Sequence, residues 1–208
     1  PIAAVLPVQG SQLVICDTGA NVDCEADHLI QFAYLGSRYS ERMYGVAAPR
    51  IGLVSNGEEE SKGNALVLAV HPRLAASSLN FVGNVEGRDL MNGGADIVVT
   101  DGFTGNVVLK TLEGTLRGVI KALFEAITQP DYKEHADALM PALLPMYATF
   151  DPENTGGAIL LGIDGVCIIS HGSSTSRAMV NGIKVAREMV ETDMVGAIRE
   201  AISATIHD

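Results

Sequence analysis

The stretch Ala95-Asp96-Ile97-Val98-Val99-Thr100-Asp101-Gly102-Phe103-Thr104-Gly105-Asn106 joins an apolar run to a helical pattern, and it indicates the fold class of the chain. The β-branched first half is typical of a buried strand. The second half supplies a carboxylate, two glycines, a hydroxyl and an amide, and a helix is predicted to follow, with Thr104 as its N-cap. Such junctions bind ligands at the carboxyl ends of strands in open α/β sheets, and a helix N-terminus offers N–H groups to an anion.

Four further junctions of the same kind occur along the chain. Apolar runs lead into loops that combine Gly with Asn, Ser, Asp or His, and these runs lie at residues 12–16, 50–54, 80–82 and 166–170. Since the carboxyl ends of parallel strands meet at one edge of a sheet, we expect all five loops to open on one cleft. The polar side chains expected to meet there are Asn21, Asn84, Asn106 and His171. The alternative is that Gly and Asn are simply the turn formers that such loops need.

Strand and helix patterns alternate along the whole sequence. Helices are predicted at residues 26–46, 64–75, 104–127 and 173–206, with a short helix at 86–91 and a broken, proline-containing one at 132–147. This alternation predicts one α/β unit over residues 1–208, a three-layer αβα sandwich with a mostly parallel sheet. Residues 115–147 are expected to form a helical hairpin that projects from the sheet, helps to build a dimer and offers an apolar tip.

Composition excludes several classes of function. The chain has 208 residues, of which 47% are hydrophobic and 19% charged, which is typical of one globular unit with a sizeable core. A net charge of −11 argues against nucleic-acid binding, which needs a basic surface. The sequence contains no apolar run of the roughly 18 residues that a membrane span needs. Three cysteines without metal-ligand spacing predict no metal site and favour a reducing compartment.

Residues 138–150 form an uncharged segment that contains Pro141 and Pro145. One interpretation is a buried core or subunit-interface segment. The other is an exposed apolar patch for a partner or a membrane. In the second case the run is too short to cross a bilayer but long enough to lie in its interface. The side chains that would mediate the contact are Leu139, Met140, Leu143 and Leu144.

Five ordered segments carry a family resemblance. They are Cys16-Asp17-Thr18-Gly19-Ala20-Asn21, Pro49-Arg50-Ile51-Gly52-Leu53, Phe81-Val82-Gly83-Asn84-Val85-Glu86-Gly87-Arg88-Asp89-Leu90, Val99-Thr100-Asp101-Gly102-Phe103-Thr104-Gly105-Asn106-Val107-Val108-Leu109-Lys110-Thr111-Leu112-Glu113-Gly114 and His171-Gly172-Ser173-Ser174. Over essentially the whole chain they resemble the phosphate acyltransferase (PlsX) family of bacterial phospholipid synthesis. Members of that family also have an N-terminal portion with an Asp-Ala-Met-Gly-Gly-Asp-type motif. We therefore expect this chain to correspond to the C-terminal part of such a protein.

The resemblance implies a cytoplasmic, homodimeric enzyme with the fold of isocitrate and isopropylmalate dehydrogenases, attached peripherally to the membrane. It implies transfer of a long-chain acyl group from acyl carrier protein to inorganic phosphate, without a metal or other cofactor. Two other functions stay open. One is a nicotinamide-dependent dehydrogenase of the same fold, although no Gly-x-Gly-x-x-Gly follows a strand. The other is a non-catalytic module that binds a membrane or partner through residues 138–150.

Acyl transfer to phosphate needs donors for the phosphate and for the oxyanion that forms on the thioester carbonyl. The predicted catalytic residues are His171, Asp101, Asn106 and Asn21. The predicted phosphate-binding residues are Gly102, Thr104, Gly105, Asn106, Gly172, Ser173, Ser174 and Lys62. His171 is expected to act as acid, base or oxyanion donor, or alternatively only to cap a helix. Lys62 has the alternative of pairing with residues 58–60.

Two further expectations concern charge. Asp17 and Asp101 would repel an ionised phosphate, so we expect them to orient loops, to hold His171 or to accept a proton. An acidic carrier protein needs a basic dock, since complementary charge speeds association. The predicted dock consists of Arg38, Arg42 and Arg50, and the alternative for each is an ordinary surface charge.

Overall fold

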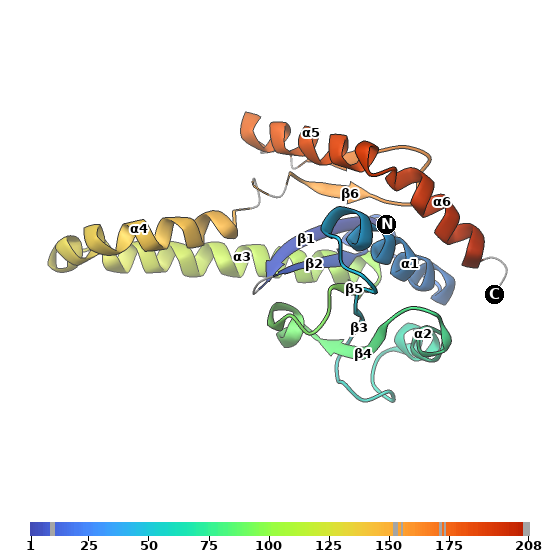
Figure 1. Ribbon diagram of the computed structural model, residues 1–208. Helices are drawn as coiled ribbons and strands as arrows, with labels where there is room; N and C mark the ends of the chain where they lie inside the picture. The colour runs from blue at the N-terminus through green and yellow to red at the C-terminus, as the bar shows by residue number, and fades with distance from the viewer. Residues whose placement is uncertain (9–10, 152–153, 155, 171, 173, 206–208) are drawn as a thin grey trace.

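The computed structural model describes residues 1–8, 11–151, 154, 156–170, 172 and 174–205 (Figure 1). The strands are β1 (Ile2–Val8), β2 (Ser11–Cys16), β3 (Ile51–Ser55), β4 (Phe81–Glu86), β5 (Ile97–Val99), β6 (Ala158–Leu160) and β7 (Cys167–Ile169). The helices are α1 (Ala26–Tyr44), α2 (Ala65–Ala76), α3 (Gly102–Ile127), α4 (Lys133–Thr149), α5 (Ser176–Glu191) and α6 (Met194–Thr205), with 3-10 helices η1 (Gly87–Asn92) and η2 (Pro130–Tyr132). The predicted α/β class is confirmed.

The sheet is mixed rather than mostly parallel. Its strand order is β4-β3-β5-β2-β1-β6-β7. β2, β3, β4 and β5 run parallel, whereas each pairing from β2 through β1 and β6 to β7 is antiparallel. The sequence patterns did not predict β1 and β6. Because three antiparallel pairings separate β2 from β7, β7 runs opposite to β2 and its carboxyl end opens on the other edge of the sheet.

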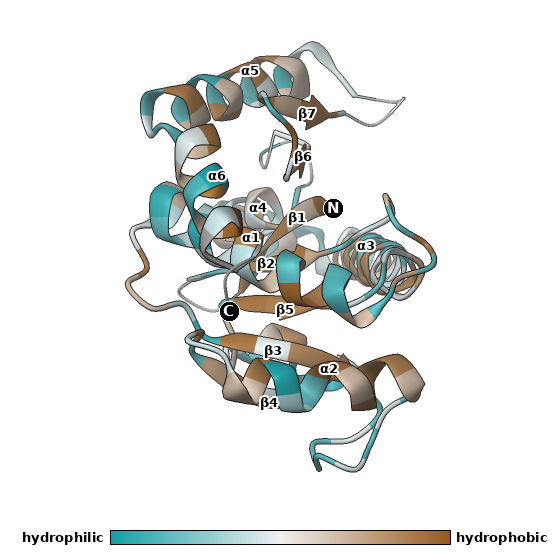
Figure 2. Ribbon diagram, turned by 90° about the vertical axis from the view of Figure 1, so that its right-hand side faces the viewer, coloured by the Kyte–Doolittle hydropathy of each residue, from teal (hydrophilic) through white to brown (hydrophobic). Residues whose placement is uncertain are grey.

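Side-chain alternation along the strands gives the sheet two apolar faces. Val14 and Val99 belong to the larger core, which α1, α2 and α6 cover with side chains such as Leu29, Leu74 and Ile198. The opposite face carries Leu13, Ile15 and Val98, and it is covered by Leu90 of η1 and Val108 of α3. Figure 2 shows α1 and α6 on one side of the central strands and α3 on the other. Helices therefore flank the sheet on both sides.

Helices α3 and α4 lie side by side and extend away from the sheet as an arm (Figure 1). Phe124 and Tyr147 join them in an edge-to-face contact with ring centroids 6.3 Å apart. Helix α4 continues through Pro141 and Pro145 and ends only at Thr149. The turn between the helices forms the tip, so residues 138–150 lie along the arm and not at its end.

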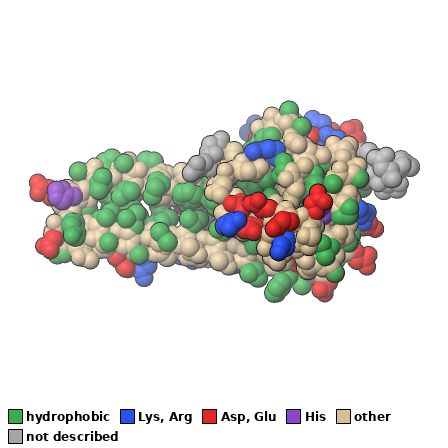
Figure 3. Space-filling model, turned by 90° about the horizontal axis from the view of Figure 1, so that it is seen from below, with side chains coloured by type: hydrophobic (Ala, Val, Ile, Leu, Met, Phe, Trp, Pro, Cys, Tyr) green, Lys and Arg blue, Asp and Glu red, His purple; other side chains and the backbone are tan. Residues whose placement is uncertain are grey.

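The surface of the arm carries many hydrophobic side chains (Figure 3). Leu139 and Leu144 are more than half exposed. The interpretation of residues 138–150 as a buried core segment is therefore wrong for this chain by itself. Within the described residues, none of the helices is both long enough and apolar enough to cross a membrane.

The last predicted helix, over residues 173–206, is in fact two helices. Helix α5 ends at Glu191 and α6 begins at Met194. Asp193 between them has a φ of 49°, in the left-handed region that an α-helix does not use. This break turns α6 back onto α1, where Met194 and Ile198 join the larger core.

Candidate functional site

The loop after β2 is organised around the carboxylate of Asp17, which is completely buried. Its Oδ1 accepts hydrogen bonds from the backbone N–H groups of Ile2, Gly19 and Ala20 at 2.8, 3.0 and 3.0 Å. Its Oδ2 accepts from the backbone N–H and the side-chain amide of Asn21 at 2.6 and 2.9 Å. Burial by itself raises the pKa of Asp17, but these hydrogen bonds hold it below its usual value. Asp17 therefore orients the loop, which is one of the roles expected for it.

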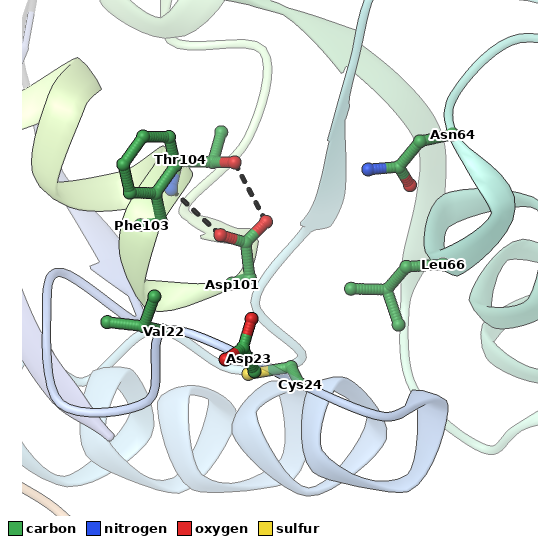
Figure 4. A pocket seen from close by; sticks show the side chains of 8 residues that line it. All are labelled: Val22, Asp23, Cys24, Asn64, Leu66, Asp101, Phe103 and Thr104. Carbon is green, nitrogen blue, oxygen red and sulfur yellow. Dashed lines mark hydrogen bonds between the residues drawn. The ribbon is translucent and has the colours of Figure 1, made fainter.

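The loop after β5 starts α3 with Asp101 as the N-cap. Its Oδ1 accepts the backbone N–H of Thr104 at 2.8 Å, and its Oδ2 accepts the Thr104 hydroxyl at 2.8 Å (Figure 4). The prediction that Thr104 caps this helix is wrong, because the carboxylate three residues earlier reaches the free N–H groups first. The Thr104 hydroxyl is consequently committed to Asp101.

Two glycines let these loops touch. The Gly102 N–H donates to the Asn21 carbonyl at 2.7 Å. A Cβ at Gly102 would lie 2.6 Å from that same oxygen, and a Cβ at Gly105 would lie 1.8 Å from the Asp17 carbonyl oxygen. These glycines are thus required for close packing of helix against loop. The same packing brings Asn21 and the start of α3 together.

A pocket of about 460 Å³ opens where these loops meet (Figure 4). Its lining comes from the β2–α1 loop, the start of α2 and the start of α3, and consists of Val22, Asp23, Cys24, Asn64, Leu66, Asp101, Phe103 and Thr104. Three helices therefore begin at this pocket. Each helix N-terminus carries roughly half a positive elementary charge, which favours an anion.

Of the eight lining residues only Asp101 and Thr104 were predicted as site residues, and Asn64 is the missed one that offers a neutral amide. Its Oδ1 caps α2 by accepting the Val67 N–H at 3.0 Å, and its amide nitrogen points into the pocket (Figure 4). The sequence contained a signal for it, because an asparagine just before a helical pattern is a typical N-cap. Such a residue uses its side-chain oxygen for the cap and keeps its amide nitrogen for another partner. The pocket lining, within the described residues, contains the carboxylates Asp23 and Asp101 and no basic side chain. An anion would therefore be bound by the side-chain amide of Asn64 and by backbone N–H groups at the helix N-termini.

Asn84 binds the backbone of the β3–α2 connection through its side-chain amide. This buried residue lies in β4, and its Nδ2 donates to the Glu59 carbonyl at 2.9 Å. Its Oδ1 is buried without a hydrogen-bond partner among the described residues. Lys62, on the same connection, is exposed and lies along Gly57, where a Cβ would be 2.6 Å from Lys62 Cγ. Lys62 is thus only two residues before the lining residue Asn64, but it does not line the pocket itself.

The described residues of the loop after β7 do not join this site. Gly172 and Ser174 follow a strand that runs opposite to β2 and β5, so the chain leaves the sheet there at the other edge. His171 and Ser173 lie outside the described residues. The prediction of one cleft at the carboxyl ends of five parallel strands is therefore wrong for this loop. Asn106 does belong with the first two loops, because its side chain lies about 3.8 Å from the position of a Cβ at Gly19.

The predicted basic dock lies away from the pocket. Arg50 and Asp96 precede β3 and β5 at the amino edge of the sheet, where the Arg50 guanidinium donates to both carboxylate oxygens at 2.8 and 3.1 Å. This pairing holds the pKa of Asp96 below its usual value. Arg38 pairs with Glu41 at 2.7 Å. Arg38 and Arg42 are exposed on α1, and Arg38 lies about 18 Å along the helix axis from its first residue.

Comparison with known proteins assigns the chain to a family. The model of the fatty acid synthesis protein family matches residues 1–196. The chain belongs to this family. It is 46% identical over 204 residues to a phosphate acyltransferase of Pelotomaculum thermopropionicum, a match that covers 98% of this chain and 60% of that protein. It is 44% identical over 208 residues to a phosphate acyltransferase of Elusimicrobium minutum, with 97% and 60% covered.

The chain thus spans about 60% of the length of the curated relatives that it matches. A phosphotransacetylase from Streptococcus pyogenes is a solved structure with a TM-score of 0.46 and 16% identity, over 97% of this chain and 53% of that one. The family resemblance inferred from the five ordered segments is confirmed by the family model and by these relatives.

Proposed function

We propose that this chain contributes the acyl-transfer site of a phosphate acyltransferase that forms acyl phosphate from acyl carrier protein thioesters and inorganic phosphate. The observation that carries this proposal is 44–46% identity, over nearly the whole chain, to proteins named phosphate acyltransferase. The pocket at the start of three helices supports it, because such a site attracts an anion without needing a metal. We assign the sheet to the dehydrogenase-like subclass on the same family ground.

In the proposed reaction a phosphate oxygen attacks the thioester carbonyl carbon, and the carbonyl electron pair moves onto its oxygen. The tetrahedral intermediate then collapses, the carbon–sulfur bond breaks, and the thiolate takes the proton that hydrogen phosphate releases. No covalent enzyme intermediate is needed. The enzyme's task is to hold the two reactants together and to stabilise the oxyanion.

We assign phosphate to the amide of Asn64 and the N-termini of α2 and α3. Asn106 and the second N–H of the Asn21 amide are the proposed oxyanion donors, since the first N–H of that amide already binds Asp17. Asp101 keeps the start of α3 in place. Gly102, Thr104 and Gly105 then act by shaping the site. The Gly102 N–H and the Thr104 hydroxyl already donate to protein oxygens, and Gly105 packs against the backbone of Asp17. Lys62, His171 and Ser173 stay candidates for the same reaction, whereas Gly172 and Ser174 are not assigned to it, because the strand before them ends at the other edge of the sheet.

The test is an assay of the complete enzyme with an acyl carrier protein thioester. Thiol release is expected only when phosphate is present, and hydroxylamine should trap the product as a hydroxamate. Asn64→Ala should raise the phosphate concentration at half-saturation by about 10-fold or more, as expected when one hydrogen bond to a charged group is lost. Asn106→Ala should instead lower kcat by about 100-fold and leave the phosphate concentration at half-saturation unchanged, because it removes an oxyanion donor. Asn56→Ala, on the exposed loop outside the pocket, is the matched control.

Two outcomes would contradict the proposal. One is thiol release that does not depend on phosphate. The other is a thermal-shift experiment in which NAD stabilises the protein and phosphate does not, because a dehydrogenase would then be the better assignment.

For the partners, we propose that the arm of α3 and α4 joins two copies of the chain and attaches the dimer to the membrane surface. Leu139, Met140, Leu143 and Leu144 supply the apolar contacts. Since the net charge is −11, attachment should depend on apolar burial and survive high salt. Replacing Leu143 and Leu144 with Glu should abolish co-flotation with liposomes, whereas co-flotation that persists would contradict the proposal.

For the carrier protein, we propose docking on the exposed face of α1 that carries Arg38 and Arg42. Arg38→Glu and Arg42→Glu should slow the reaction with acyl carrier protein and leave phosphate saturation unchanged. A rate that responds neither to salt nor to these substitutions would exclude this dock. Arg50 is the weakest member of the predicted set, because its guanidinium is occupied by Asp96.

A further inference from the structure

We propose that the apolar side chains at the rim of the pocket, Phe103, Val22 and Leu66, bind the aliphatic chain of the acyl substrate and determine which chain lengths react fastest. This inference rests on the proposed function and deepens it.

The first observation is exposure of large apolar groups at the polar site itself. Phe103 is 63% exposed and Val22 is 55% exposed. Val22 lies in the β2–α1 loop and Phe103 in the first turn of α3, and the hydrogen bonds of Asp17 and Asp101 that hold these segments involve neither side chain. Exposed apolar groups that gather around one pocket indicate a surface that something apolar covers.

The second observation is the arrangement of the pocket. Figure 4 shows Phe103 and Val22 on one side and Leu66 on the other, with Asp101 and Thr104 between them. Asp101 and Thr104 thus lie between the apolar groups, and Asn64 lies on the side of Leu66. A thioester also combines polar and apolar parts, since its carbonyl needs donors and its chain needs apolar contact. The chain would extend from the reacting carbonyl over the rim.

The third observation limits the length of this surface. Val107 is one helical turn beyond Phe103 on the same face and is 49% exposed. The next turn on that face carries Lys110, which pairs with Glu113 at 2.9 Å. The apolar stripe therefore ends about 10 Å along α3 from Phe103. Only the methylene groups nearest the thioester can lie on it, so each of these should matter and later ones should not.

The experiment measures kcat/KM of the complete enzyme for acyl carrier protein thioesters from six to sixteen carbons at saturating phosphate. Each methylene buried on the stripe should raise kcat/KM about fourfold, up to a plateau. Phe103→Ala should flatten this rise and lower the ratio of plateau to shortest chain by about 10-fold. Phe103→Leu should restore much of the ratio, and phosphate at half-saturation should stay unchanged in both variants.

Val119→Ala is the matched control. Val119 lies on the same helix, is 61% exposed and is not part of the pocket lining, so its substitution should leave the chain-length profile as it is. Circular dichroism and thermal unfolding establish that each variant is folded. Val22→Ala provides a second variant, on a different loop, in case Phe103→Ala does not fold.

Three results would separate the possibilities. An unchanged chain-length profile in folded, active Phe103→Ala and Val22→Ala overturns this inference and leaves the proposed function standing. Equal loss for all chain lengths together with lower thermal stability also overturns it, since these side chains then pack under another part of the protein. Absence of phosphate-dependent thiol release in the unsubstituted enzyme overturns the proposed function itself.

Discussion

The two ends of α3 lie in contrasting surroundings. At its first turn, Gly105 packs so closely on the Asp17 loop that a Cβ would lie 1.8 Å from a backbone oxygen. Farther out, at Gly114 and Gly118, an added Cβ would meet nothing within 4 Å. The first turn of α3 is therefore fixed by contacts with residues distant in sequence, whereas the outer half, from Gly114 to Ile127, rests on its own hydrogen bonds and on α4. Substitutions at the two ends should differ accordingly.

The largest effect should come from removing the carboxylate that holds the inner end. Asp17→Ala leaves five donors without their buried acceptor and should cost about 3–5 kcal/mol of unfolding free energy. Urea denaturation of the 208-residue chain measures this. The control is Asp23→Ala, an exposed carboxylate of the same loop, which should stay within about 0.5 kcal/mol. A loss below about 1 kcal/mol for Asp17→Ala would show that this carboxylate does not fix the inner end of α3.

The glycines of α3 provide the next test, within one helix. Gly105→Ala should destabilise the chain by about 2–4 kcal/mol, because either the helix or the loop must move. Gly114→Ala should stabilise it by about 0.5–1 kcal/mol, because alanine favours a helix and the site is open. Thermal and urea unfolding give both values. If both substitutions changed the unfolding free energy in the same direction, the surroundings of Gly105 and Gly114 would not differ as proposed.

A smaller effect concerns pH. The folded-state pKa of Asp17 lies below its usual value, so the stability that this group contributes is present above the unfolded pKa of about 3.9. That stability is lost as the pH falls through the folded pKa. We expect the unfolding free energy of the chain to fall as the pH drops below about 5, and that of Asp17→Asn to fall less over the same range. Parallel curves would mean that Asp17 is not the group responsible.

The contrast along α3 also explains what could be predicted from sequence. The strands β2, β3 and β5, and the helices that follow them, have periodic patterns that depend only on near neighbours. By contrast, β1 contains Pro7, and β6 has only the three residues Ala158–Leu160, so neither has a distinctive pattern. Their antiparallel pairings reverse β7. This is why the loop after β7 was expected at the wrong edge.

In the candidate site too, local features could be predicted from the sequence and contacts between distant segments could not. The loops around Asp17 and Asp101 were identified, since a polar loop between a strand and a helix is a local feature. The partners of their polar atoms were not, because the hydrogen bond from Ile2 to Asp17 and the contact of Gly105 with the Asp17 backbone join distant segments. Asn64 was missed as a lining residue because its free amide is apparent only once its other end is seen to cap α2.

The smallest effect should come from the outer end. Leu139 and Leu144 are 52% and 54% exposed, so each buries little area that Glu would forfeit. At a protein concentration where sedimentation shows a monomer, Leu139→Glu and Leu144→Glu should each change the unfolding free energy by less than about 0.5 kcal/mol. At higher concentrations, where the proposed dimer forms, the same substitutions should lower the apparent stability, because a partner that binds only the folded chain stabilises it by mass action. A large loss already in the monomer would show that the arm is held by this chain's own contacts. In that case its exposed leucines would be structural, and the proposal that they contact a second copy and a membrane would lose its basis.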